Sequence, residues 1–148
     1  TCTPWKDGEW TMQELSGLCL KLATLCQTDS TLSLSEHFHD ASNSVIDTSR
    51  TVSRRTSIVI TGIRQGDSLV NFLWDDGVYT TVSTPIAGAS RPGTGDIFAS
   101  ILAVRGETLL SSVQKAANFV GLCIAGSEKA GTPVQEGVVF EKYLAALL

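Results

Sequence analysis

Long hydrophobic runs and basic clusters are both missing from this sequence of 148 residues. No apolar stretch approaches the roughly 20 residues that a membrane-spanning helix needs, so the sequence predicts no membrane partner. The chain has 11 Lys and Arg against 15 Asp and Glu, a net charge of −4. Without a basic patch, that balance argues against nucleic acid as the main partner. Nothing near Thr1 resembles a signal peptide, because charged residues in segment 5–10 interrupt any apolar core.

A Cys-x-x-Cys pair is also missing among the four cysteines. Cys19 and Cys26 lie two helical turns apart, about 10 Å, which is too far for a disulfide within one helix. We therefore expect Cys2, Cys19, Cys26 and Cys123 to be buried thiols in a reducing compartment. The cytoplasm is the default location.

The first half of the chain predicts one helix followed by an irregular segment, within a single domain of residues 1–148. Thr11-Met12-Gln13-Glu14 is a capping box, and apolar residues recur behind it with helical spacing as far as Cys26. Residues 27–55 are rich in Ser and Thr, contain no Gly or Pro and keep no period, which predicts a surface insertion. His37 and His39 lie there beside Glu36 and Asp40. Side chains two apart in a strand point to opposite faces, so a solvated loop is favoured over a metal site.

The second half predicts strands followed by helices. Residues 57–62 form a β-branched run ending in Thr61-Gly62, typical of a strand buried on both faces, as in a parallel sheet. Ligands of open α/β sheets bind beyond the carboxyl ends of strands, so this end is a candidate contact. A simple strand-to-turn exit fits equally well. Segments 69–74 and 78–83 flank Asp75-Asp76-Gly77 and predict a β-hairpin. Helical spacing follows over 96–106, from Thr108 to about 126, and over 140–147.

The segment Arg91-Pro92-Gly93-Thr94-Gly95-Asp96 combines two glycines with an acidic residue at the predicted start of a helix. Glycine permits backbone angles closed to other residues and lets a ligand approach the main chain. A helix beginning near Asp96 would present unpaired N–H groups and a partial positive charge, which suit an anion. The Asp96 carboxylate could take a proton from a hydroxyl that attacks phosphorus. The alternative is an N-cap aspartate after a glycine turn.

In this order, the features resemble the C-terminal half of ribokinase-fold kinases, and most closely bacterial pyridoxal kinases. The likeness lies in residues 4–15 (PWKDGEWTMQEL), 58–64 (IVITGIR), 90–100 (SRPGTGDIFAS) and 137–141 (GVVFE). The resemblance implies an α/β fold, the ribokinase-like three-layer αβα sandwich. This chain would supply its C-terminal half, with a β-hairpin and three to four helices.

The resemblance also implies roles for individual residues. Asp96 would be the catalytic base that deprotonates the hydroxymethyl group of pyridoxal, pyridoxine or pyridoxamine. Gly93, Thr94 and Gly95 would form the anion hole for the transferring phosphoryl group. Nucleotide contacts would come from Thr61, Gly62 and Asn118. ATP and Mg²⁺ would be the cofactors, and the complete protein would be a homodimer.

The 148 residues contain no Asn-x-x-Glu, the motif that helps such kinases hold magnesium, and no counterpart of the half that bears the vitamin pocket. We therefore expect this chain by itself to be catalytically incomplete. Two alternatives stay open. One is another ribokinase-fold kinase, acting on a hydroxymethylpyrimidine or a sugar. The other is a nucleotide-binding module without catalytic activity.

Overall fold

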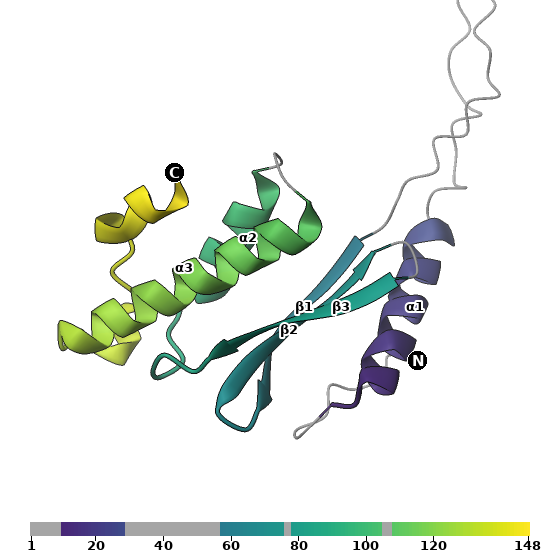
Figure 1. The fold of residues 1–148 in the computed structure, drawn as a ribbon, viewed down its shortest axis with the longest axis horizontal. Coiled ribbons are helices and arrows are strands. Elements are labelled where there is room, and N and C mark those ends of the chain that lie inside the picture. Colours follow the sequence, from purple (N-terminus) through teal and green to yellow (C-terminus); the bar gives the residue numbers. More distant parts are fainter. Residues whose placement is uncertain (1–9, 29–56, 76–77, 105–107) are drawn as a thin grey trace, which may run out of the picture.

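The computed structural model describes residues 10–28, 57–75, 78–104 and 108–148, and helices lie at both ends of a central sheet (Figure 1). In chain order the described elements are α1 (Met12–Thr28), β1 (Ser57–Gln65), β2 (Ser68–Asp75), β3 (Val78–Pro85), α2 (Thr94–Ala103), α3 (Leu109–Lys129) and the short 3₁₀ helices η2 (Val134–Glu136) and η3 (Glu141–Leu147).

The described strands form one antiparallel meander in the order β1-β2-β3. The predicted hairpin is confirmed, because Asp75 pairs with Val78 across the β2–β3 turn. The prediction of a parallel strand over 57–62 is wrong. β1 pairs antiparallel with β2 through a two-residue turn, in which Gly66 has a φ of 56°. It is an edge strand and half-exposed, and a short β-branched run cannot by itself distinguish the two kinds of sheet.

A β-bulge interrupts β1 at Thr61 and Gly62. Ile60 pairs with Phe72 and Ile63 pairs with Val70, so two residues of β1 stand opposite the single residue between them on β2. Gly62 has a φ of 72°, which suits glycine, and the strand continues to Gln65. The prediction that Thr61 and Gly62 end a strand is therefore wrong.

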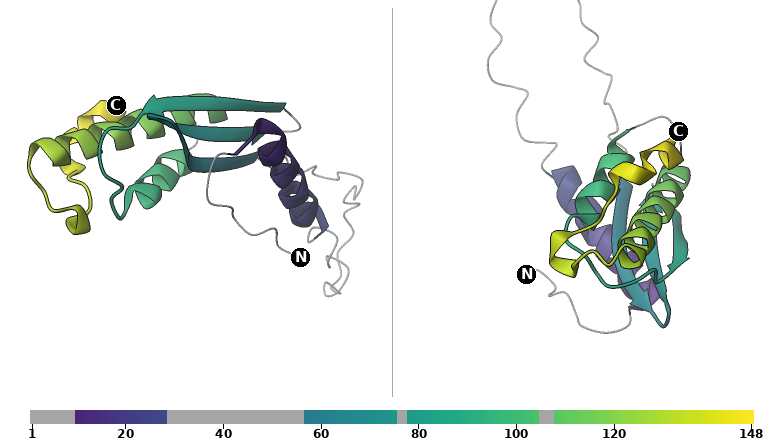
Figure 2. Two further views of the ribbon diagram at one scale, coloured as in Figure 1. Left: turned by 90° about the horizontal axis from the view of Figure 1, so that it is seen from below. Right: turned by 90° about the vertical axis from the view of Figure 1, so that its left-hand side faces the viewer.

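Each face of the sheet packs against a different set of helices, so the fold is mixed α/β (Figures 1 and 2). One cluster joins α1 to one face of β1 and β2, and the other joins α2 and α3 to the opposite face of the sheet. The buried members of the first are Trp10, Leu15, Cys19, Ile63, Val70 and Phe72. Those of the second are Leu73, Val82, Phe98, Val113, Ala116 and Ala117.

Helices α1 and α3 begin where local sequence predicts. In the capping box, Thr11 N–H donates to Glu14 Oε2 over 2.9 Å and Glu14 N–H donates to Thr11 Oγ1 over 3.2 Å. Thr108 caps α3 by accepting from Ser111 N–H over 3.2 Å. By length and composition α3 could also cross a membrane, but it packs one side against β3 and α2 as a core helix. The last predicted helix is present as the 3₁₀ helix η3.

Several predictions concern residues outside the described ranges. The predicted insertion, residues 27–55, lies there except for its first two residues, which end α1. His37, His39 and Cys2 also lie outside, as does the side chain of Cys26. Cys19 and Cys123 are free and buried, as predicted, and burial raises the pKa of both thiols.

Candidate functional site

The start of α2 presents three backbone N–H groups without helical partners. Gly93 is the N-cap residue, with the left-handed angles φ 81° and ψ −11°. The first helical hydrogen bond runs from Ile97 N–H to Gly93 O over 3.1 Å. The N–H groups of Thr94, Gly95 and Asp96 precede that bond and lie at the positive end of the helix dipole. These three groups are shifted by one residue from the predicted anion hole.

Asp96 is exposed in the first turn of α2. Its carboxylate has no hydrogen-bond or ion-pair partner among the described residues, and only its backbone oxygen is used, accepting from Ser100 Oγ over 2.8 Å. The alternative of an N-cap aspartate is wrong, because Gly93 holds that position and Asp96 is the third helical residue. The carboxylate is therefore accessible to a ligand at the end of the helix.

The two glycines of the motif have different roles. Gly93 needs a positive φ, whereas Gly95 is helical, and a Cβ added there would meet no atom within 4 Å. Only Gly93 uses the angles that glycine permits, and the helix begins at Thr94 rather than near Asp96, where it was predicted to begin.

Gly93→Ala and Gly95→Ala form a matched pair that tests this difference. We expect Gly93→Ala to lower the free energy of unfolding by about 1–2 kcal/mol, because a Cβ is disfavoured in the left-handed region. Gly95→Ala should raise it by about 0.4–1 kcal/mol, since alanine fits the helix and restricts the unfolded chain. Urea unfolding of both variants is the measurement. Equal losses would contradict the assigned start of α2.

Arg91, two residues before the N-cap, is buried and makes contacts that the sequence did not predict. Its guanidinium donates to backbone oxygens of Thr132, Pro133 and Gly137, and Nη2 also pairs with Glu128 Oε1 at 3.1 Å. The one sequence signal was a charged side chain immediately before the glycine motif. Its partners could not be found from sequence because they lie 37–46 residues further on.

The hydrogen bonds that Glu128 accepts from Ala89 N–H and from Arg91 hold the pKa of its carboxyl below the ordinary value of 4.5. A lowered folded-state pKa adds stability above the unfolded-state pKa, and that stability disappears as the pH falls through the folded-state value. We expect the melting temperature of the wild-type protein to drop more steeply below about pH 4.5 than that of Glu128→Gln. Thermal melts from pH 7 to pH 3 are the measurement, and parallel curves would contradict the ion pair.

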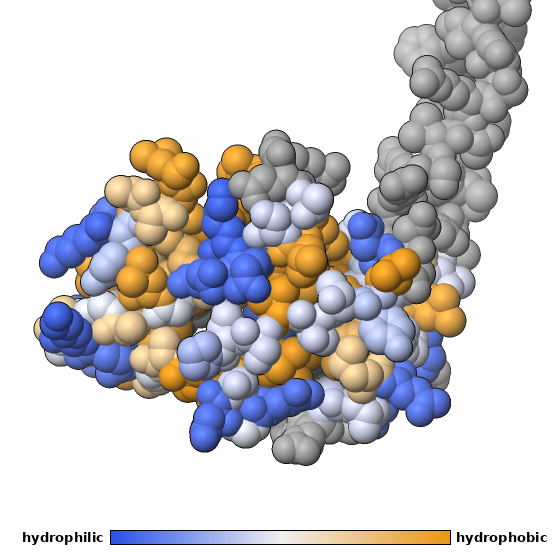
Figure 3. Space-filling view, in the orientation of Figure 1, coloured by the Kyte–Doolittle hydropathy of each residue, from blue (hydrophilic) through white to orange (hydrophobic). Residues whose placement is uncertain are grey.

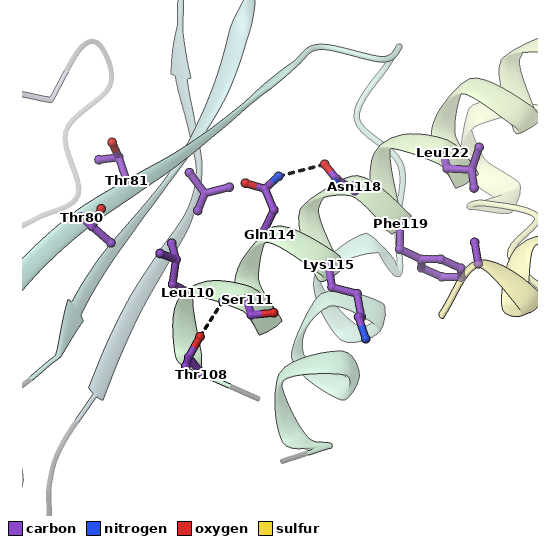
Figure 4. Close-up of a pocket in the computed structure, with 12 residues that line it drawn as sticks. Thr80, Thr81, Thr108, Leu110, Ser111, Gln114, Lys115, Asn118, Phe119 and Leu122 are labelled. Atoms are coloured by element: carbon purple, nitrogen blue, oxygen red, sulfur yellow. Dashed lines mark hydrogen bonds between the residues drawn. The ribbon is translucent and has the colours of Figure 1, made fainter. Parts of the chain in front are cut away.

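An open groove of about 740 Å³ lies between α3, β3 and η3 (Figure 4). Gln114 and Asn118 lie one turn apart on α3, and their amides are joined by a hydrogen bond of 3.0 Å. Apolar side chains of the lining include Phe119 and Leu122. Figure 3 shows several hydrophobic patches on the face seen in Figure 1, separated by hydrophilic and intermediate residues. The size suits a small organic molecule.

The groove brings only one of the predicted site residues into its lining. Asn118 lines it, but the start of α2 does not, and neither do Thr61 and Gly62. Those two lie on the far edge strand of the sheet, separated from β3 by β2. Gly62 N–H instead points to the buried Asn71, whose Oδ1 accepts it at 3.4 Å. Among the described residues, the three predicted nucleotide contacts Thr61, Gly62 and Asn118 therefore do not lie together with the start of α2 in one site.

No group of three His, Cys, Asp or Glu side chains suited to a metal ion occurs in the described ranges. Comparison with protein-family models and with curated proteins found no match to this chain.

Proposed function

We propose that this chain carries the phosphoryl-transfer part of an ATP-dependent kinase of the ribokinase type, which phosphorylates the 5′-hydroxymethyl group of a B6 vitamer. The observation that carries the proposal is the start of α2, where an exposed carboxylate without a partner among the described residues adjoins three N–H groups that have no helical partner. A base next to an anion-binding helix end suits phosphoryl transfer, which depends on positioning and electrostatic stabilisation. The proposal places the complete enzyme in the cytoplasm as a homodimer.

In the proposed reaction, Asp96 accepts the proton of the substrate hydroxyl. The hydroxyl oxygen forms a bond to the γ-phosphorus of ATP, and the bond from that phosphorus to the β–γ bridging oxygen breaks. The electron pair of the broken bond leaves with ADP. N–H groups of Thr94, Gly95 and Asp96 offset the negative charge on the transferring group. ATP and Mg²⁺ are proposed as cofactors from the resemblance alone.

The nucleotide base is proposed to lie in the groove on α3. The amides of Gln114 and Asn118 can donate to and accept from the edge of a heterocycle, while Phe119 and Leu122 supply apolar contact. The support for Thr61 and Gly62 as phosphate contacts is weaker, since they lie at a bulge on the far edge strand. Their role stays a proposal from the resemblance alone.

The proposal is tested with the chain itself. We expect magnesium-ATP to shift the backbone NMR signals of Thr94, Gly95, Asp96 and Asn118, with negligible phosphorylation of pyridoxal by these 148 residues. A form extended upstream of Thr1 should then gain turnover. Asn118→Ala should weaken ATP binding, whereas Thr24→Ala on the exposed side of α1 should leave it unchanged. Signals that stay unshifted at millimolar ATP would overturn the proposal.

The same experiment separates the alternatives. A nucleotide-binding module is the second candidate, because no residue at the start of α2 lines the groove. It predicts ATP binding at Asn118, unchanged signals at Asp96 and no turnover in any extended form. A kinase for a hydroxymethylpyrimidine or a sugar predicts turnover with those substrates in place of pyridoxal.

A further inference from the structure

We propose that Arg91 is a positioning residue, which fixes the Pro92–Gly93 turn and so aims the free N–H groups and the carboxylate at the start of α2. The inference rests on the proposed function of that helix end. It concerns a residue that the resemblance leaves without a role.

The Arg91 side chain joins two parts of the chain that are distant in sequence. The side chain is 1% exposed. Its Nη1 lies 3.0 Å from Thr132 O, 3.2 Å from Pro133 O and 3.0 Å from Gly137 O. These carbonyls belong to the segment after α3, so the guanidinium ties that segment to the residues that lead into α2.

The turn itself is held on both sides of Arg91. Thr94 Oγ1 donates to Arg91 O over 2.9 Å, and Ala89 N–H donates to the same Glu128 oxygen that pairs with Arg91. The backbone at Gly137 approaches so closely that a Cβ there would lie 3.1 Å from Pro92 O. The chain from Ala89 to Thr94 is therefore fixed by contacts to α3 and to the segment after it.

The contacts of the Arg91 side chain suit a role in orienting the start of α2 better than a role in raising the free energy of unfolding. Nε of Arg91 is buried and has no hydrogen-bond partner among the described residues, which is costly. The carboxylate of Glu128 is 43% exposed, and an ion pair that reaches solvent on one side often contributes little net stability. The contact nevertheless orients the buried guanidinium. Because the planar guanidinium presents its donors in a fixed fork, it can hold three carbonyls and a carboxylate in a defined geometry.

The test compares ligand selectivity in the full chain. Arg91→Met should weaken ATP binding about tenfold or more and leave adenosine binding unchanged, since only the phosphates reach the start of α2. Arg91→Lys should recover part of the ATP affinity. Arg64→Met, at an exposed arginine of β1, is the matched control and should bind both ligands as wild type does. A purely structural role would lower the melting temperature without changing the ratio of ATP to adenosine affinity, and that outcome would overturn the inference.

Two further measurements keep the inference separate from the proposed function. If the wild-type chain binds no ATP, the proposed function fails, and amide hydrogen exchange decides the inference. Faster exchange at Ile97, whose N–H bonds to Gly93 O, in the Arg91→Met variant supports positioning. Unchanged exchange there overturns it. If Arg91→Met does not fold, Glu128→Gln takes its place, because it weakens only one of the contacts of Arg91. Its ratio of ATP to adenosine affinity and its hydrogen exchange at Ile97 are then measured.

Discussion

Asp96→Asn is expected to lower kcat by about 10²–10⁴-fold in any preparation of this protein that phosphorylates pyridoxal. Asparagine keeps the shape of aspartate but cannot accept the substrate proton, so the loss falls on the chemical step. Nucleotide affinity should change little, because the N–H groups at the start of α2 remain in place. Steady-state kinetics at saturating ATP is the measurement.

The control for this substitution is Asp67→Asn, which makes the same chemical change at an exposed position in the β1–β2 turn. That variant should keep wild-type kcat. A thermal melt of Asp96→Asn completes the comparison, because an aspartate that only complements the helix dipole is worth at most about 1 kcal/mol of stability. Wild-type turnover in Asp96→Asn would remove this aspartate from the reaction and, with it, the main support for a kinase.

Phe72→Ala should lower the free energy of unfolding by about 3–5 kcal/mol, the usual cost of removing a buried aromatic ring. Phe72 is 0% exposed and lies in the cluster that joins α1 to the sheet. Its ring also stacks on Tyr79, with centroids 5.9 Å apart. The cavity would open beneath Leu15 and Cys19, so α1 would lose part of its attachment.

Chemical denaturation of Phe72→Ala beside Val78→Ala gives the measurement and its control. Val78 is 72% exposed at the start of β3, and its truncation should change stability by less than about 0.5 kcal/mol. A loss below about 1 kcal/mol in Phe72→Ala would contradict the packing of α1 on the sheet.

Local patterns were sufficient for the starts of α1 and α3 and for the hairpin. The Thr11–Glu14 capping box and the Thr108 cap depend on residues three apart, and the β2–β3 turn depends on two residues. The pairing of β1 could not be predicted in the same way. Its apolar run suits a strand of either kind of sheet, and only the partner strand decides between them.

The candidate site was predictable where it depends on neighbours in sequence. The order of glycines and aspartate located the start of α2 within two residues, but it did not distinguish Gly93 from Gly95. That distinction depends on which residue begins the helix. The sequence did not predict the contacts of Arg91. A single arginine is not part of a periodic pattern, and its three acceptors are backbone oxygens, which every residue carries whatever its side chain.

The bulge in β1 determines where this strand can vary in length. Thr61 and Gly62 together occupy the place opposite Asn71, so Ile60 and Ile63 face the same side although they are three residues apart. A chain that lost one residue at 61–62 would regain plain alternation and keep those isoleucines against α1. The loss of Ile60 instead would turn the preceding residues to the opposite face. The loss of one residue from β1 is therefore compatible with the core at the bulge, whereas its loss between paired residues elsewhere exchanges inner and outer side chains on one side of the change.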